Sequence, residues 1–265
     1  MPGFEHISFA ESLEKLAPIT LEEMDSIKLM NRIDTKYVTN EATLLRLLEA
    51  AAAAGYRALV SGSGKLQPYD SVYFDTADLY MFHLHRNRRL VRQKVRTRCY
   101  LSSGDSFLEI KRKNNHGRTK KKRTPIPRAE LMDFRADTAA CTYLADHSWF
   151  RAGELTPSAE TAFSRITLVN PAKTERLTID TQLFFKSFRS GRETSLQNAV
   201  IIELKQDGRA DSQMKRILLD LRIRPMRVSK YCMAVTLTDP SARGGRFKQK
   251  VRNIEKIIGN KLVTI

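Results

Sequence analysis

The sequence is poor in cysteine and has no long apolar run. Among its 265 residues, the three cysteines stand far apart and form no Cys-x-x-Cys pair: Cys99, Cys141 and Cys232. This spacing argues against a zinc site or a disulfide framework and favours a reducing compartment. No segment approaches the roughly 18 apolar residues of a membrane span, and the N-terminus lacks a basic start followed by an apolar stretch. We therefore expect a cytoplasmic protein with no signal peptide and no transmembrane segment.

Acidic and aromatic residues are also scarce. Asp and Glu number 29 against 46 Lys and Arg, so the formal net charge is +17, which indicates a polyanionic partner such as nucleic acid, anionic lipid or polyphosphate. Aromatic residues make up 8% of the chain, and most lie within apolar strand segments. The exposed stacking residues typical of nucleic-acid binding are not visible, so no specific nucleic-acid partner is expected.

The chain is expected to form one domain, residues 1–265, in which helices alternate with strands. With 42% hydrophobic residues, it is long enough for a substantial core. Apolar periodicity and capping residues predict helices at residues 39–54, 128–146, 211–221 and 246–262. The last belongs to a basic amphipathic helix at about 243–262, which we expect to pack against the sheet, although such a helix can also contact an anionic membrane.

The predicted strands carry cations on one face. Side chains alternate between the two faces of a strand, so residues 91–101 place five polar side chains together: Arg92, Lys94, Arg96, Arg98 and Tyr100. The same alternation recurs in residues 106–113, 176–180 and 200–205. A solvated outer face would explain any one of these strands. The repetition of cationic faces on several strands is unusual for a protein surface, which normally mixes charges of both signs.

One arrangement satisfies both faces of all these strands. An antiparallel β-barrel with helices packed on its outside would bury the apolar face and turn the cations toward a polar lumen. Like charges in such a lumen repel one another, so the lumen should hold anions. Phosphate oxygens suit it, because guanidinium groups bind them bidentately and ammonium groups add compact charge.

A series of short motifs follows along residues 27–236. They are RIDTKYV at 32–38, YFDT at 73–76, VRTRCY at 95–100, LEIKRK at 108–113, TAFSRITL at 161–168, RLTIDT at 176–181, IELK at 202–205 and RVSKY at 227–231. In this ordered set the chain resembles the VTC (vacuolar transporter chaperone) polyphosphate polymerase domain, within the CYTH or triphosphate tunnel metalloenzyme superfamily. The resemblance implies an α+β fold in which an antiparallel β-barrel forms a triphosphate tunnel with helices packed on its outside.

The resemblance also implies the site. Position by position, it makes six residues catalytic phosphate ligands: Lys36, Arg96, Arg98, Lys111, Arg165 and Lys230. Further substrate-binding residues are expected around them: Lys94, Arg176, Lys205, Arg227, Ser229 and Lys122. Glu203 is implied as the ligand of Mn²⁺ or Mg²⁺. Glu109 is either a second metal ligand or an internal ion-pair partner.

The sequence departs from the family pattern in places. Phe163 stands two positions before Arg165, where an aromatic hydroxyl is expected, and Arg227 stands where lysine is common. Hydrolytic members of the superfamily carry an E-x-E-x-K strand, and the matching residues 32–36 begin with a cation, Arg32, in place of the first carboxylate. Fewer carboxylates bind less divalent metal, which favours transfer to phosphate over hydrolysis.

The function implied by the resemblance is a polyphosphate polymerase. It would transfer the γ-phosphate of ATP to a growing inorganic polyphosphate chain, without a general base. Two alternatives stay open: a metal-dependent triphosphatase on the same fold, and a non-catalytic polyphosphate-binding sensor. A separate membrane partner, and a place at the inner face of a membrane, also stay open. Replacement of Lys111 or Arg165 by alanine is expected to abolish turnover without loss of thermal stability, because it removes like-charge repulsion.

Other polar residues have simpler interpretations. His83 and His85 fall on one side of a predicted strand, without a Cys or Asp at metal-binding spacing. Asp75 is expected to hold a turn. Residues 117–125 are expected to form a solvated loop, whose basic residues could guide polyphosphate toward the tunnel mouth.

Overall fold

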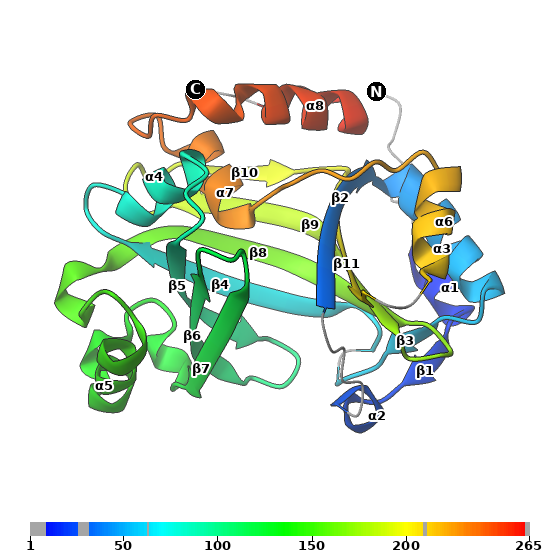
Figure 1. Ribbon diagram of the computed structural model, residues 1–265, viewed down its shortest axis with the longest axis horizontal. Helices are drawn as coiled ribbons and strands as arrows, with labels where there is room; N and C mark the ends of the chain where they lie inside the picture. The colour runs from blue at the N-terminus through cyan, green and yellow to red at the C-terminus, as the bar shows by residue number, and fades with distance from the viewer. Residues whose placement is uncertain (1–8, 26–31, 63, 209–210, 263–265) are drawn as a thin grey trace.

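The computed structural model describes residues 9–25, 32–62, 64–208 and 211–262, and its centre is a curled antiparallel sheet (Figure 1). Its strands follow one another in the order β2 (Arg32–Asn40), β11 (Ala199–Asp207), β9 (Glu175–Ser187), β8 (Thr156–Val169), β4 (Gln67–Asp75), β5 (Arg92–Tyr100), β6 (Ser106–Lys113) and β7 (Thr119–Pro125). At the margins, β10 (Glu193–Leu196) pairs with β9, and β3 (Arg57–Leu59) joins β8 to the parallel strand β1 (Ala17–Ile19).

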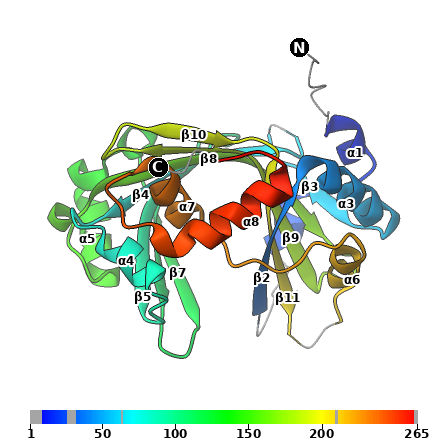
Figure 2. The same cartoon turned by 90° about the horizontal axis from the view of Figure 1, so that it is seen from above.

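The sheet bends so that its two ends face each other. Figure 2 shows β5 and β7 descending on one side and β2 and β11 on the other, with β8 running between the two sides. Within the described ranges the pairing path ends at β2 and at β7, and no ladder joins these two strands. The predicted α+β fold is therefore confirmed, with the barrel present as a curled half-barrel. We call its inner side the concave face.

Helices cover the convex face beside β2, β11 and β9, as the sequence predicts. The helices are α1 (Ala10–Glu14), α3 (Glu41–Ala53) and α6 (Gln213–Asp220). They share one apolar cluster with these strands, which includes Leu13, Leu44, Leu48, Ile179, Ile202, Leu204 and Met214. Helix α3 begins near the predicted position because Asn40 Oδ1 accepts a hydrogen bond from the Thr43 N–H at 2.8 Å.

Helix α5 (Thr138–His147) covers the convex face of β5 and β6. Its apolar cluster includes Val72, Val95, Leu108, Ile110, Phe134 and Leu144. The helix predicted at 128–146 is shorter than expected, because two 3-10 turns, Arg128–Glu130 and Phe134–Ala136, come first. The Asp137 carboxylate then accepts a hydrogen bond from the Ala140 N–H at 3.0 Å, which starts α5.

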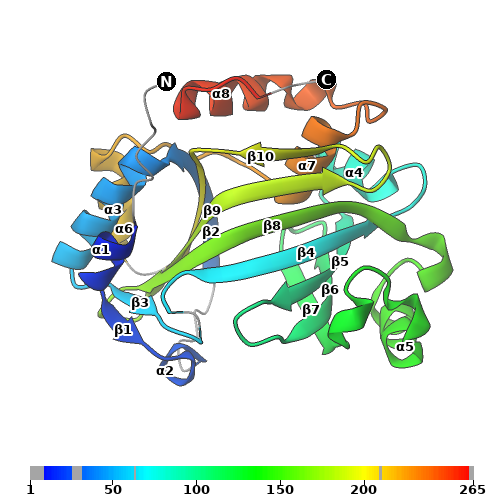
Figure 3. The ribbon, with the colours of Figure 1, turned by 180° about the vertical axis from the view of Figure 1, so that it is seen from behind.

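Two helices close one end of the concave face. Helices α7 (Lys230–Thr238) and α8 (Lys248–Ile258) pack in one cluster that includes Val38, Phe163, Phe185, Ile201, Tyr231, Val235, Val251 and Ile254. Helix α8 is the basic amphipathic helix of the sequence, and Figures 1 and 3 show it lying across α7 and β10. Its expected packing against the sheet is confirmed, while the remainder of the concave face stays polar.

The prediction of a strand at His83 and His85 is wrong, because both residues lie on helix α4 (Tyr80–Arg86). The buried Asp75 carboxylate accepts hydrogen bonds from the N–H groups of Met81 and Phe82, each at 2.9 Å, and so caps the start of this helix. The structural role expected for Asp75 is thereby confirmed.

The expectation of a loop over residues 117–125 is also wrong in its greater part. Residues Thr119–Pro125 form β7, which pairs with β6 in a register that sets Lys121 opposite Lys111. A run of basic residues can therefore continue a sheet when every second side chain faces an interior that holds counter-charges.

The remaining α-helix is α2 (Leu21–Asp25), which follows β1. None of the helices in the ranges that the structure describes is long and apolar enough to cross a membrane. Residues 1–8, which bear on the expectation of no signal peptide, lie outside the described residues, as does the side chain of Arg32.

Candidate functional site

The register of the sheet collects the predicted cations on the concave face. Residues directly opposite one another on paired strands share a face, and Lys36 lies opposite Glu203 while Lys94 lies opposite Lys111. Pairings and side-chain contacts bring these predicted residues together: Lys36, Lys94, Arg96, Arg98, Glu109, Lys111, Arg165, Arg176, Glu203, Lys205 and Lys230. They come from six strands and helix α7, so the site depends on the curl of the sheet.

A carboxylate that the sequence analysis did not assign to the site, Asp180, lies in the middle of the face. It is buried on β9, accepts two hydrogen bonds from the Arg165 guanidinium at 2.6 and 2.9 Å, and pairs with the Lys230 ammonium group. Burial opposes ionisation, but Arg165 and Lys230 hold the pKa of Asp180 well below its usual range. Alternation along residues 176–180 is the sequence signal for its position, because it sets Asp180 on the face of Arg176.

A second buried carboxylate, Glu109, also holds two cations. Its Oε2 accepts from Arg96 Nε at 2.8 Å, and its Oε1 accepts from Lys121 Nζ at 2.8 Å. These neighbours, with Arg98, hold the pKa of Glu109 well below its usual range although burial opposes this. Lys121 was not predicted as a site residue, although its neighbour Lys122 was.

The third carboxylate, Glu203, is held more loosely. Its Oε1 lies 3.6 Å from Lys36 Nζ and its Oε2 lies 3.4 Å from Lys205 Nζ. Burial opposes ionisation, but Lys36, Lys205 and Lys111 lower the pKa of Glu203 well below its usual value. The contacts are longer than those of Asp180 and Glu109, so the Glu203 oxygens retain capacity for another ligand.

Three cations of the concave face have no carboxylate partner in the part of the chain that the structure describes. Lys94 donates to Ser229 Oγ at 2.7 Å, Arg98 donates to Ser71 Oγ at 2.9 Å, and Lys111 makes no ion pair. Burial lowers the pKa of Lys94, and burial together with Arg96 lowers the pKa of Arg98 to about 10. The positive charges of these three residues are therefore not neutralised by an ion pair within the described part of the chain.

Lys111 is influenced by charges on both walls of the half-barrel. Loss of hydration lowers its pKa to about 8, although its side chain is accessible to water within the curl of the sheet. Glu203 on the opposite wall opposes this shift, while Lys36, also on that wall, adds to it. The ammonium group therefore senses charges from β2 and β11 as well as from its own wall, which is the geometry expected of a shared polar interior.

Aromatic rings support the cations at the closed end. The Phe163 ring lies 4.2 Å from Lys230 Nζ and within 5.4 Å of the Arg98 and Arg165 guanidinium carbons. The Tyr69 ring stacks on Phe163 with centroids 5.3 Å apart. Phe163 lacks the hydroxyl of the family pattern, but its ring face still attracts cations. The rings thus limit the positions available to three of the predicted phosphate ligands.

Tyr73 is another residue that sequence reasoning missed. Its hydroxyl accepts a hydrogen bond from Arg96 Nη1 at 3.0 Å, and the residue is buried on β4. Burial opposes ionisation of the phenol, yet Arg96, Lys94 and Arg98 lower the pKa of Tyr73 to about 7. The motif YFDT marked this segment, but only the fold brings its tyrosine beside the cations.

The remaining three predicted substrate-binding residues differ in where they lie. Lys122 lies opposite Ile110, a residue of the convex core, and its Nζ is 3.4 Å from His147 Nε2 on α5, so it is not brought to the concave face. Arg227 is exposed and precedes helix α7, which begins only at Lys230. Ser229 caps α7 and accepts the hydrogen bond from Lys94.

The two predicted metal ligands differ in how well they fit a divalent ion. Both oxygens of Glu109 already accept short hydrogen bonds from cations, so Glu109 does not fit. Glu203 does fit, because Mg²⁺ is commonly held by one or two carboxylates together with substrate phosphates and water. The described residues contain no group of three or more His, Cys, Asp or Glu arranged to hold a metal ion.

The fold and the site define a class of protein: a curled antiparallel sheet whose concave face gathers cations from several strands. Residues 31–238 match the family model of the VTC domain. The chain belongs to the VTC domain family, as its motifs predict. A search of curated proteins found no match.

Solved structures with a similar fold come from several organisms. One is a candidate adenylate cyclase from Bacillus halodurans, with a TM-score of 0.49, 15% identity and coverage of 76% of this chain and 96% of that one. Another is a candidate adenylyl cyclase from Hippeastrum, described as having a dominant triphosphatase activity, with a TM-score of 0.49, 14% identity and coverage of 79% of this chain and 97% of that one.

Proposed function

We propose that this chain is a polyphosphate polymerase that transfers the γ-phosphate of ATP to the end of an inorganic polyphosphate chain. The observation that carries the proposal is the trio Lys94, Arg98 and Lys111, which make no ion pair with a carboxylate among the described residues. A chain of phosphates supplies the missing counter-charge and engages cations on several strands at once. Membership of the VTC domain family supports the same class of ligand.

The state of the carboxylates supports transfer rather than hydrolysis. Glu109, Asp180 and Glu203 each lie between two cations that lower their pKa, which makes them weak proton acceptors. General-base activation of water is most effective when the pKa of the base lies near the working pH. The terminal oxygen of a polyphosphate chain is already ionised, so its attack needs alignment and charge neutralisation but no base.

In the proposed reaction, the triphosphate of ATP binds to Arg96, Arg98, Lys111 and Arg165, while Lys36 and Lys230 orient the entering chain. A P–O bond forms between the terminal chain oxygen and the γ-phosphorus. The bond from that phosphorus to the bridging oxygen breaks, and its electron pair leaves with ADP. When bound at Glu203, Mn²⁺ or Mg²⁺ supplies additional neutralisation of the phosphate oxygens.

We also propose that the protein acts in the cytoplasm. Its three cysteines are free, Cys99 and Cys232 are buried, and Cys232 lies in the apolar cluster beside α7. Unpaired buried thiols are typical of proteins from reducing compartments.

The test is incubation of the purified chain with ATP, Mn²⁺ or Mg²⁺ and a short polyphosphate primer, followed by gel electrophoresis and phosphorus NMR. Lengthening chains with matching ADP would establish the polymerase. Orthophosphate and ADP without chain growth would indicate a triphosphatase instead. Unchanged ATP with tight polyphosphate binding would indicate a sensor, and both of these results would overturn the proposal.

A further inference from the structure

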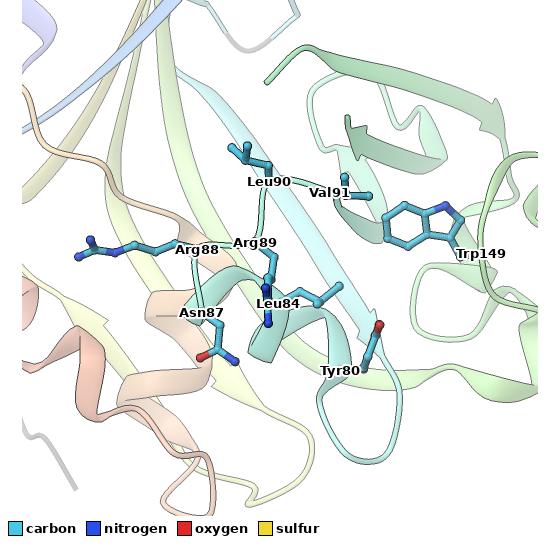
Figure 4. A pocket seen from close by; sticks show the side chains of 8 residues that line it. All are labelled: Tyr80, Leu84, Asn87, Arg88, Arg89, Leu90, Val91 and Trp149. Atoms are coloured by element: carbon cyan, nitrogen blue, oxygen red, sulfur yellow. The ribbon is translucent and has the colours of Figure 1, made fainter. Parts of the chain in front are cut away.

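A groove of about 730 Å³ lies between α4, the loop that joins α4 to β5, and the segment after α5. Figure 4 shows the side chains that line it: Tyr80, Leu84, Asn87, Arg88, Arg89, Leu90, Val91 and Trp149. We call this set the α4 groove. None of its residues belongs to the proposed phosphate site.

The α4 groove gathers apolar side chains that are exposed to solvent. The exposed fractions are 53% for Leu90, 47% for Val91, 46% for Tyr80 and 39% for Trp149. Single exposed apolar residues are normal on a protein surface, whereas a contiguous group marks a binding surface. Tyr and Trp are also the residues most often found at the energetic centre of protein interfaces.

The charges of the α4 groove have one sign. Arg88 and Arg89 are exposed, make no ion pair among the described residues, and no Asp or Glu lines the groove. The Arg112 guanidinium carbon lies 5.4 Å from the centre of the Trp149 ring, so a third arginine borders the apolar residues. A ligand that covers this surface must bring carboxylates as well as apolar side chains.

The backbone of the groove is held in place. The N–H groups of Asn87, Arg88 and Arg89 donate to carbonyl oxygens of α4 at 2.9, 3.0 and 3.0 Å, and Arg88 has φ 58. A residue other than glycine in this left-handed region needs support from its surroundings. A surface that is already ordered loses little conformational entropy on binding.

We propose that the α4 groove docks a short acidic, amphipathic segment of another protein, with its apolar side chains on Leu90, Val91 and Trp149 and its carboxylates on Arg88 and Arg89. A polyphosphate chain does not match, because it has nothing apolar to cover these residues. A second copy of this chain is disfavoured by its net charge of +17.

The test uses the only tryptophan in the chain, Trp149, as the reporter. Short random peptides displayed on phage are selected on the full-length protein, and the enriched peptides are synthesised and titrated while Trp149 emission is recorded. We expect enriched peptides that combine acidic and apolar residues and cause a saturable blue shift. Affinity should fall about tenfold or more in Arg88→Glu and in Leu90→Ser.

Two variants serve as matched controls. Arg222, like Arg88, is an exposed arginine that follows a helix, and its own φ is positive at 56°. Leu219, on α6, is an exposed leucine with 73% of its surface accessible. Arg222→Glu and Leu219→Ser should bind the peptide as the parent protein does. Arg89→Glu provides a second charge reversal if Arg88→Glu unfolds, as checked by circular dichroism.

Several results would overturn the docking proposal. Failure to enrich any peptide would do so, as would enriched peptides that bind equally after their acidic residues are changed to lysine. So would a shift of Trp149 emission produced instead by phosphatidylserine-containing vesicles, by inorganic polyphosphate or by increasing protein concentration. None of these results depends on polymerase activity, so the docking proposal and the proposed function are tested separately.

Discussion

The ammonium group of Lys230, the first residue of α7, pairs with the Asp180 carboxylate on β9, and the same carboxylate holds the guanidinium group of Arg165. Asp180 thereby joins a helix to the sheet and occupies two of the predicted phosphate ligands. Glu109 and Glu203 each hold two further cations in the same way. In the proposed function, an entering polyphosphate chain would therefore compete with the protein's own carboxylates for these groups.

Replacement of Asp180 by asparagine should destabilise the protein in the absence of ligand. Removal of one member of a buried ionic group leaves uncompensated charge, which costs about 3 kcal/mol or more. We expect tripolyphosphate to restore part of this loss, because it supplies a new partner for Arg165 and Lys230. Urea unfolding with and without tripolyphosphate measures both effects. Asp133→Asn, which removes an exposed carboxylate paired with Arg135, should change little, and an Asp180→Asn midpoint equal to that of the parent would contradict the prediction.

Arg165→Ala should lose both tripolyphosphate binding and stability. The sequence suggested that this change would spare stability by relieving repulsion, but the Asp180 carboxylate more than balances that repulsion and raises the pKa of Arg165 above its usual value. Its removal leaves Asp180 with Lys230 alone, and the loss should be about 3 kcal/mol. Thermal unfolding followed by circular dichroism measures it. A melting temperature at or above that of the parent would instead support relief of like-charge repulsion.

Lys111→Met should behave in the opposite way. Lys111 makes no ion pair among the described residues and has a lowered pKa, so its removal should leave stability equal or higher. The affinity for tripolyphosphate should fall on the order of 10–100-fold, the effect of losing one charged hydrogen bond. Isothermal titration calorimetry measures the binding. Lys122→Met is the control, because Lys122 lies on the adjacent strand with its Nζ near His147; an equal loss of affinity there would contradict the register of β7.

Binding of tripolyphosphate should weaken as the pH rises from 7 to 9. The pKa values of Lys111 and Lys230 are lowered to about 8, so both ammonium groups lose charge in this interval. Phosphate favours the charged forms, hence binding near pH 8 should take up protons. Calorimetry in two buffers with different ionisation enthalpies measures this uptake. An uptake of zero, or affinity that is constant with pH, would contradict the assignment.

The lowered pKa of Lys111 should make the unliganded protein more stable as the pH rises. The unfolded chain keeps Lys111 protonated up to its usual pKa of 10.5, while the folded chain releases the proton near 8. Between these pH values the unfolded state binds more protons than the folded state, so Lys111 makes the free energy of unfolding rise with pH. The rise should be smaller in Lys111→Met. Urea midpoints across this interval compare the two proteins.

Glu203→Gln should weaken the dependence of activity on Mn²⁺ or Mg²⁺, while tripolyphosphate binding without metal stays largely intact. The amide keeps the shape of the side chain but loses the charge that a divalent ion prefers. We expect the metal concentration for half-maximal activity to rise on the order of 10–100-fold. In Glu109→Gln the same concentration should not change, because both Glu109 oxygens are taken by Arg96 and Lys121. Equal shifts in the two variants would contradict the assignment of Glu203 as the metal ligand.

Much of the fold and part of the site could be predicted from local patterns. The alternation of Arg96 and Arg98 with Val95 and Cys99 places the cations on one face, whatever partner the strand has. Helix α3 could be placed because Asn40 is a strong capping residue before a leucine-rich stretch. The run containing Lys121 and Lys122 was misread, because its strand depends on pairing with β6 and on a counter-charge from Glu109.

The sequence by itself determined the family and the cationic face on which most of the predicted phosphate ligands lie, because these follow from residue order and from the two-residue period of strands. Only the tertiary structure decided which cations are neutralised and which are not. That distinction separates Lys111 from Arg165, two residues with the same predicted role. It depends on where Asp180, Glu109 and Glu203 fall after the sheet curls, because electrostatic energy is set by distances across the concave face and by burial, not by separation along the chain.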